Sequence, residues 1–181
     1  MKSGKFSTFN RRVLNAALAS VVVLGGTGLV SNAHAITANA TANVVQAITV
    51  AETRALNFGK FVASSGGTVV LTNEDVTVPS GTSVRVSPST AASGKFTVTG
   101  DGAATYTITV DATATLAHAV TTTSTMEVTA ITPSVTTGGV LGGTTGSEGT
   151  QIVYVGATLT QGAANVSGLH SGTYSVTVAY N

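Results

Sequence analysis

The sequence predicts an all-β fold, specifically an immunoglobulin-like Greek-key β-sandwich, and three observations support this prediction. After the first 35 residues, short runs alternate apolar and polar side chains with a period of two, and no run has the 3.6-residue period of a helix. Turn residues separate these runs about every ten residues, a spacing typical of sandwiches. Thr, Val, Ala and Gly dominate the composition, with 5% aromatic and 8% charged residues, which suits strands joined by many turns.

The first 35 residues have the pattern of a signal peptide. Basic residues come first, an apolar stretch follows over residues 13–30, and Ala33-His34-Ala35 is a small-x-small cleavage signal. Glycines interrupt the apolar stretch, which favours cleavage over a membrane anchor. We therefore expect residues 1–35 to be removed at Ala33 and Ala35. Residues 36–181 are then expected to form one exported β-sandwich domain with no membrane span after cleavage.

Removal of this segment changes the charge of the protein. Four of the eight basic residues lie within it, whereas all seven acids follow it, so the mature charge is 4 − 7 = −3. The remaining cations form no basic patch, and we therefore expect no nucleic-acid partner. The mature chain has 181 − 35 = 146 residues and no cysteine. That length is enough for one domain to bury a core without disulfides.

The segment from Ile36 to Ala51 alternates regularly. The residues of its apolar parity are Ile36, Ala38, Ala40, Ala42, Val44, Ile48 and Val50, and Gln46 is the exception. Fifteen extended residues span roughly 50 Å, more than a usual strand covers. The run is therefore a strand preceded by a protruding arm (about 36–47), two strands in succession, or an ordinary first strand with a frayed end.

The middle of the chain reads as short strands and turns. Leu56 and Phe58 alternate before Gly59, which indicates a bulge or turn. An Asp-Gly turn at 100–102 lies between two alternating runs, a strong hairpin signal. Residues 135–150 are rich in Gly and Thr and predict a mobile loop or weakly specified turn. Residues 116–124 are ambiguous. The expected strands are 68–71, 76–78, 84–86, 95–99, 106–110, 126–131, 151–155 and 158–160.

The last stretch, Gly168–Asn181, is the most regular strand pattern. Tyr174, Val176, Val178 and Tyr180 share one parity, and small or polar residues take the other. We expect the aromatic and β-branched residues to face the core. A terminal strand of this kind needs a partner at its edge, because open edges invite other chains.

A search for catalytic chemistry is negative. His118 and His170 are far apart in sequence without a carboxylate at ligand spacing, so they are weak evidence for zinc. No serine lies in a Gly-x-Ser-x-Gly elbow. The glycine pairs at 138–149 match no phosphate-binding loop, which needs a following Lys and Ser/Thr. We expect no catalytic site, no metal and no cofactor, and we predict that the protein is not an enzyme.

The C-terminal run resembles the last strand of chaperone–usher pilus subunits. In that motif a glycine lies fourteen residues from the end, alternating hydrophobic residues follow, and the penultimate residue is tyrosine. The matching positions here are Gly168, Tyr174, Val176, Val178 and Tyr180. The opening Ala-Thr-Ala-Asn-Val-Val, residues 56–59 and residues 96–100 also resemble an uncharacterised family of exported bacterial domains with a pilin-like layout.

The resemblance implies an immunoglobulin-like sandwich that lacks its last strand. A periplasmic chaperone fills the gap during transit, pairing with the C-terminal strand, and an outer-membrane usher directs assembly. In the fibre the N-terminal arm of the next subunit replaces the chaperone, which is strand addition. Here the donor arm is the run with Ile36, Ala38, Ala40, Ala42 and Val44. The absence of a cysteine pair and the shallow alanine face depart from the best-known pilins and favour a cysteine-free branch.

The leading hypothesis is therefore a structural subunit of a bacterial fimbrium, or pilus. It would pass through the periplasm, polymerise by donor-strand exchange and act in adhesion at the cell surface. The alternative is a self-complete secreted β-sandwich that acts as a surface-coat or binding module. A secreted hydrolase with an unrecognised site is the third hypothesis.

Overall fold

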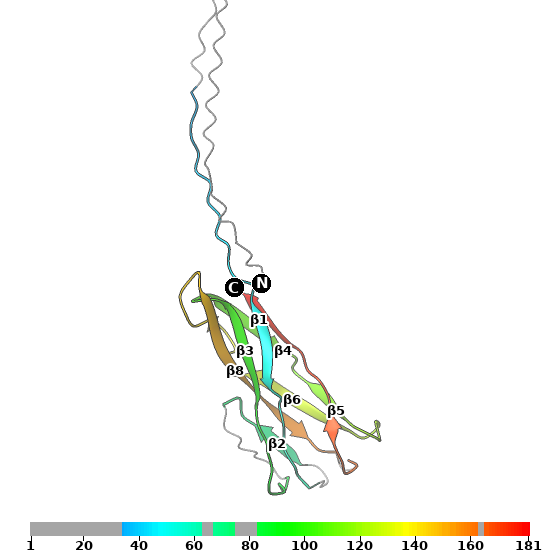
Figure 1. Cartoon of the computed structure of the whole chain (residues 1–181). Coiled ribbons are helices and arrows are strands. Elements are labelled where there is room, and N and C mark those ends of the chain that lie inside the picture. The colour runs from blue at the N-terminus through cyan, green and yellow to red at the C-terminus, as the bar shows by residue number, and fades with distance from the viewer. Residues whose placement is uncertain (1–33, 63–66, 75–82, 163–164) are drawn as a thin grey trace, which may run out of the picture. The chain divides into compact units, whose positions relative to one another are not determined.

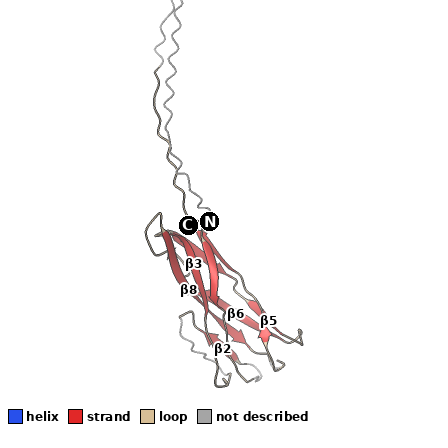
Figure 2. Ribbon diagram, in the orientation of Figure 1, coloured by secondary structure: helices blue, strands red, loops and turns tan. Residues whose placement is uncertain are grey.

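The computed structural model describes residues 34–62, 67–74, 83–162 and 165–181, and residues 42–181 form one compact unit. The predicted signal peptide up to residue 33 and the predicted strand 76–78 lie outside the described residues. Every regular element described is a strand (Figure 2). The described residues contain no helix that could cross a membrane.

The strands form two antiparallel sheets, which confirms the predicted β-sandwich. The first sheet has the order β1-β3-β8-β6-β5-β9, with β2 paired to β8, and the second has the order β10-β4-β7. Strands β1, β3 and β8 run side by side in Figure 1. The bounds are β1 Thr49–Arg54, β2 Thr68–Leu71, β3 Gly94–Asp101, β4 Thr105–Val110, β5 Ala114–His118, β6 Thr125–Pro133, β7 Gly139–Val140, β8 Glu148–Thr160, β9 His170–Ser171 and β10 Val176–Tyr180.

This strand order matches an immunoglobulin arrangement with one position open. In that arrangement one sheet has the order A-B-E-D and the other C-F-G. Strands β1, β3, β8 and β6 take the places of A, B, E and D, while β4 and β10 take C and F. No described strand pairs with the second edge of β10, which is where G would lie.

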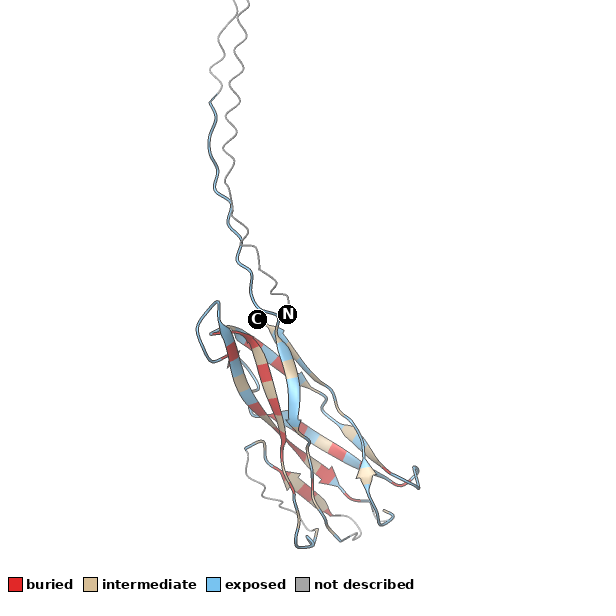
Figure 3. Ribbon diagram, in the orientation of Figure 1, coloured by how far each residue is buried: buried red, intermediate tan, exposed pale blue. Residues whose placement is uncertain are grey.

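Two clusters of buried side chains fill the sandwich. Buried residues alternate with half-buried ones along β3 and mostly with exposed ones along β6 (Figure 3), as the period-two pattern predicts. The first cluster centres on Phe96, Met126, Val128, Val155 and Leu159. The second contains Val98, Tyr106, Ile108, Leu141 and Val153.

The predicted hairpin at 95–110 is wrong in its pairing, although both strands exist. Strand β3 belongs to the first sheet and β4 to the second. The turn between them bonds to the 141–147 segment instead: Gly102 N–H donates to Ser147 O, and Asp101 Oδ1 accepts from Gly146 N. The Asp-Gly turn therefore connects two layers and does not close a hairpin within one.

The Gly-rich stretch 135–150 is more structured than predicted. It contributes β7, which pairs with β4, and Leu141 is 1% exposed in the second core cluster. The two strands expected on either side of Gly156 are a single strand, β8. A Cβ at Gly156 would lie 2.5 Å from Leu71 O, because the end of β2 crosses there. That glycine permits close backbone approach and does not break the strand.

Candidate functional site: an open groove between two edge strands

The described residues form a groove whose two walls come from opposite ends of the chain. One wall is β1 with residues 55–61, and the other is residues 166–176. The groove contains a smaller cavity of about 370 Å³ near Val50 and Val176, and a larger one of about 820 Å³ toward Phe61 and Val166. The two cavities share five lining residues: Ala55, Leu56, Gly172, Thr173 and Tyr174.

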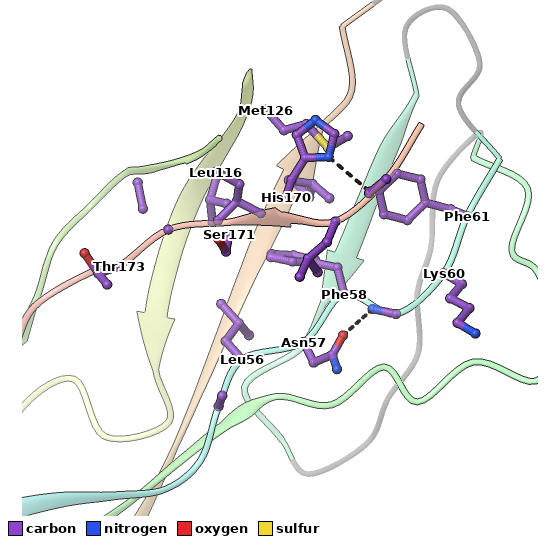
Figure 4. A pocket seen from close by; sticks show the side chains of 18 of the residues that line it. Leu56, Asn57, Phe58, Lys60, Phe61, Leu116, Met126, His170, Ser171 and Thr173 are labelled. Carbon is purple, nitrogen blue, oxygen red and sulfur yellow. Dashed lines mark hydrogen bonds between the residues drawn. The ribbon is translucent and has the colours of Figure 1, made fainter. Parts of the chain in front are cut away.

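Hydrophobic core residues form the floor of this groove. Met126, Val128 and Leu159 are buried members of the first cluster and line the larger cavity. Figure 4 shows Leu56, Phe58, Leu116 and Met126 gathered around the 170–173 segment. The groove therefore opens toward the interior of the sandwich, and its lining is mostly apolar.

Both walls carry open backbone edges. Strand β1 pairs only with β3, and β10 pairs only with β4, among the described strands. After β1, Asn57 forms an isolated β-bridge with Ala92. The Oδ1 atom of Asn57 accepts a hydrogen bond from the N–H of Gly59, which forms a turn with φ +82°. An extended peptide between the walls would find unpaired N–H and C=O groups on either side.

The predicted donor arm is exposed and carries no strand. Residues 36–47, which include Ile36, Ala38, Ala40, Ala42 and Val44, are all exposed, and β1 begins only at Thr49. Ile36 is 93% exposed and Val44 91%. Of the two cleavage-signal residues, Ala35 is exposed, and Ala33 lies outside the described residues.

The predicted C-terminal strand is divided between the two sheets. Residues 170–171 form β9, which pairs with β5, and only 176–180 form β10. Gly168 lies in the groove wall and Tyr174 lies outside both strands, at the junction of the two cavities. Val176, Val178 and Tyr180 pack against the core clusters. The long strand was overestimated because the same alternating pattern continues through a segment that changes sheets.

Residues 48–180 match a family described as "Domain of unknown function (DUF4402)". The chain belongs to the DUF4402 family. The match begins directly after the exposed segment 36–47 and covers both walls of the groove. No curated protein and no solved structure matches the chain.

Tyr180 holds the base of the arm in this DUF4402 domain. Its hydroxyl donates to the carbonyl of Gln46 at 2.7 Å and accepts from the N–H of Asp101 at 2.6 Å. The two bonds tie the end of β10, the turn after β3 and the last residues of the arm together. The arm therefore starts from a fixed point at the end of β10.

The two histidines of the DUF4402 domain lie close together, which their sequence positions did not predict. Their ring centroids are 5.0 Å apart. His118 Nδ1 accepts from the N–H of Thr121 at 2.8 Å, and its Nε2 lies 3.3 Å from Ser167 O. These bonds fix the loops at that end of the groove. Among the described residues, no group of three or more His, Cys, Asp or Glu could hold a metal ion.

Sequence reasoning missed the polar groups of the groove. Tyr174 Oη is buried without a hydrogen-bond partner, and burial, followed by the nearby Glu52 carboxylate, raises the pKa of Tyr174 to about 12. Glu52 lines the smaller cavity. The sequence does place Glu52 on the same strand face as Ile48 and Val50. Only the register of β1 with β3 shows that this face lines the groove.

Proposed function

We propose that this protein is a structural subunit of a bacterial surface fibre and that it polymerises by strand addition. The arm 36–47 of one copy would occupy the groove of the next. One observation carries the proposal: an exposed alternating arm and an apolar groove with two open strand edges occur in the same chain. Strand addition uses such an edge for backbone bonds and alternate side chains for contacts with the floor.

The arm and one wall of the groove have the same number of residues. The wall from Val50 to Phe61 comprises twelve residues with a turn at Gly59, and the twelve residues of the arm span roughly 36 Å when extended. The arm contains no charged residue, so it can cover an apolar floor without desolvating an ion pair. Because its inward residues are mostly alanine, backbone hydrogen bonds would supply more of the affinity than apolar burial at about 25 cal/mol per Å².

The wider proposal follows the resemblance to chaperone–usher subunits. The subunit would be exported with residues 1–35 as signal peptide, held in the periplasm by a chaperone and passed through an usher to the cell surface. A chaperone strand would occupy the same groove before the arm does. This order keeps the apolar floor covered at each stage and limits aggregation through the open edges.

The test is a pair of matched arm substitutions together with a deletion. Removal of residues 36–43 is expected to leave a folded domain that forms no fibres, as judged by circular dichroism and electron microscopy. Ala40→Asp places a charge on the inward parity and is expected to stop assembly, because burial of an unpaired carboxylate is costly. Asn39→Asp places the same charge on the outward parity and is expected to assemble.

Fibres from the deletion variant would contradict the proposal. A full-length protein that stays monomeric at high concentration, with amide protons along β1 and β10 protected from exchange, would favour the alternative of a self-complete binding module. Size-exclusion chromatography and hydrogen exchange of the purified protein distinguish the two outcomes.

A further inference from the structure

An acidic side chain lies on the inner face of an edge strand. In the register of β1 with β3, Val50 pairs with Val98 and Glu52 pairs with Phe96. Val98 and Phe96 are core residues at 0% and 7% exposure, and directly opposed residues project to the same face of a sheet. Glu52 therefore points toward the smaller cavity that it lines, and it is exposed while the groove is open.

The two cations that β1 and β3 carry lie on the other face, and Lys60 lines the larger cavity. Arg54 pairs with Lys95, and both cations lie over the ring of Tyr154, with Cζ at 6.0 Å and Nζ at 5.7 Å from its centroid. Arg54 also donates to Ser93 O. Both cations are thus directed away from the smaller cavity, and Glu52 is exposed there.

A hydrogen-bond donor without a partner lies beside Glu52. Tyr174 Oη is buried and unpaired, its ring packs edge-on against Phe96 at 6.2 Å, and Glu52 and Tyr174 line the same cavity. A buried hydroxyl without a partner costs about 1–3 kcal/mol. An exposed carboxylate, which would need a donor once it is covered, and a buried donor without an acceptor therefore occupy the same end of the groove.

We propose that Glu52 and Tyr174 form a polar gate that determines which strand the groove accepts. The inference rests on the proposed function, with the arm of a second copy as occupant. Seating the arm covers Glu52, and the Tyr174 hydroxyl then becomes its donor. The arm supplies no cation, and an acidic residue over Glu52 would be rejected by repulsion. Small uncharged residues such as Ala38, Ala40 and Ala42 leave room for the carboxylate to turn toward Tyr174.

The experiment measures binding of a labelled peptide, Ile-Thr-Ala-Asn-Ala-Thr-Ala-Asn-Val-Val-Gln-Ala, to the full chain by fluorescence anisotropy. Glu52→Gln removes the charge that must be covered and is expected to tighten binding about tenfold, equal to about 1.4 kcal/mol. Tyr174→Phe is expected to weaken binding, and to weaken it less in the Glu52→Gln background. Glu127→Gln, at an exposed position on β6 outside the groove, is the matched control and is expected to bind like the parent.

A peptide series then locates the gate. A peptide with lysine at the position of Ala38, Ala40 or Ala42 that lies over Glu52 is expected to bind the parent chain more tightly than the unchanged peptide. With the Glu52→Gln chain, the two peptides are expected to bind equally. Equal affinities of the parent and Glu52→Gln chains would overturn the gate while leaving strand addition in place. Failure of the peptide to bind any variant would instead contradict the proposed function, and the gate with it.

Discussion

At the scale of single residues, Tyr174 and Tyr180 of the C-terminal run differ in the hydrogen bonds that their hydroxyls make. Tyr180 makes two hydrogen bonds through its hydroxyl and ties the arm to the turn after β3. The Tyr174 hydroxyl makes no hydrogen bond. It lies so close to Gly94 that a Cβ on that residue would be 2.8 Å from the hydroxyl oxygen. Gly100 leaves similar room for the Tyr180 hydroxyl. Two glycines six residues apart on β3 thus accept two tyrosines six residues apart on the last segment.

The raised pKa of Tyr174, about 12 against the ordinary 10.0 of tyrosine, makes stability fall at alkaline pH. Between these values the unfolded chain loses the phenolic proton and the folded chain keeps it, so the unfolded state binds fewer protons. Stability is therefore complete below pH 10 and falls as the pH rises toward 12. Urea unfolding at pH 9 and pH 11.5 is expected to show this loss.

Tyr174→Phe is expected to reduce that loss and to remove one phenolic step near pH 12 from the absorbance titration at 295 nm. Tyr154→Phe, on the outer face beside Arg54 and Lys95, is the control and is expected to keep the step. An unchanged titration in Tyr174→Phe would show that another tyrosine is responsible.

At the scale of elements, the alternation of apolar and polar residues was enough to locate strands in the sequence, but not to show which strands pair. The predicted strand 68–71 is confirmed as β2, and 126–131 lies within β6. The run 168–181 follows one parity, yet it changes sheet between Ser171 and Val176. Alternation reports which side chains face inward, and both sheets of a sandwich share one interior. It therefore cannot show which sheet a strand joins.

The two faces of β10 give a matched pair of substitutions. Val178 pairs with Ile108 and packs on the second cluster, whereas its neighbour Ala179 pairs with Thr107 and is exposed. Val178→Asp is expected to cost on the order of 3 kcal/mol or more, because it leaves a carboxylate against apolar side chains without a partner. Ala179→Asp is expected to change stability by less than about 0.5 kcal/mol. Thermal melts followed by circular dichroism measure the difference, and equal losses would contradict the assigned face.

At the scale of the whole molecule, the groove arises because the two edge strands come from opposite ends of the chain. Residues 48–61 and 166–180 were each visible as alternating sequence, but their facing arrangement depends on how β3, β4 and β8 place them. The same holds for Glu52, whose neighbour Tyr174 lies 122 residues later. Sequence reasoning could identify the arm and the last strand, and it could not identify the floor between them.

The arm and the groove are different surfaces of the same chain, so strand addition is a head-to-tail contact and should give open chains and not closed pairs. The two halves can be separated by mutation. A chain without residues 36–43 keeps the groove. Ala55→Trp, at an exposed position that lines both cavities, is expected to block the groove while keeping the arm.

Each variant alone is expected to remain monomeric by multi-angle light scattering. An equimolar mixture is expected to form heterodimers and nothing longer, because the single productive contact joins one intact arm to one intact groove. The dimer is also expected to melt at a higher temperature as concentration rises, since occupancy stabilises the grooved chain by about 2.7 kcal/mol at a hundredfold excess over Kd. Higher oligomers in the mixture would mean that a second surface drives association, and the absence of dimers would remove the arm as the occupant of the groove.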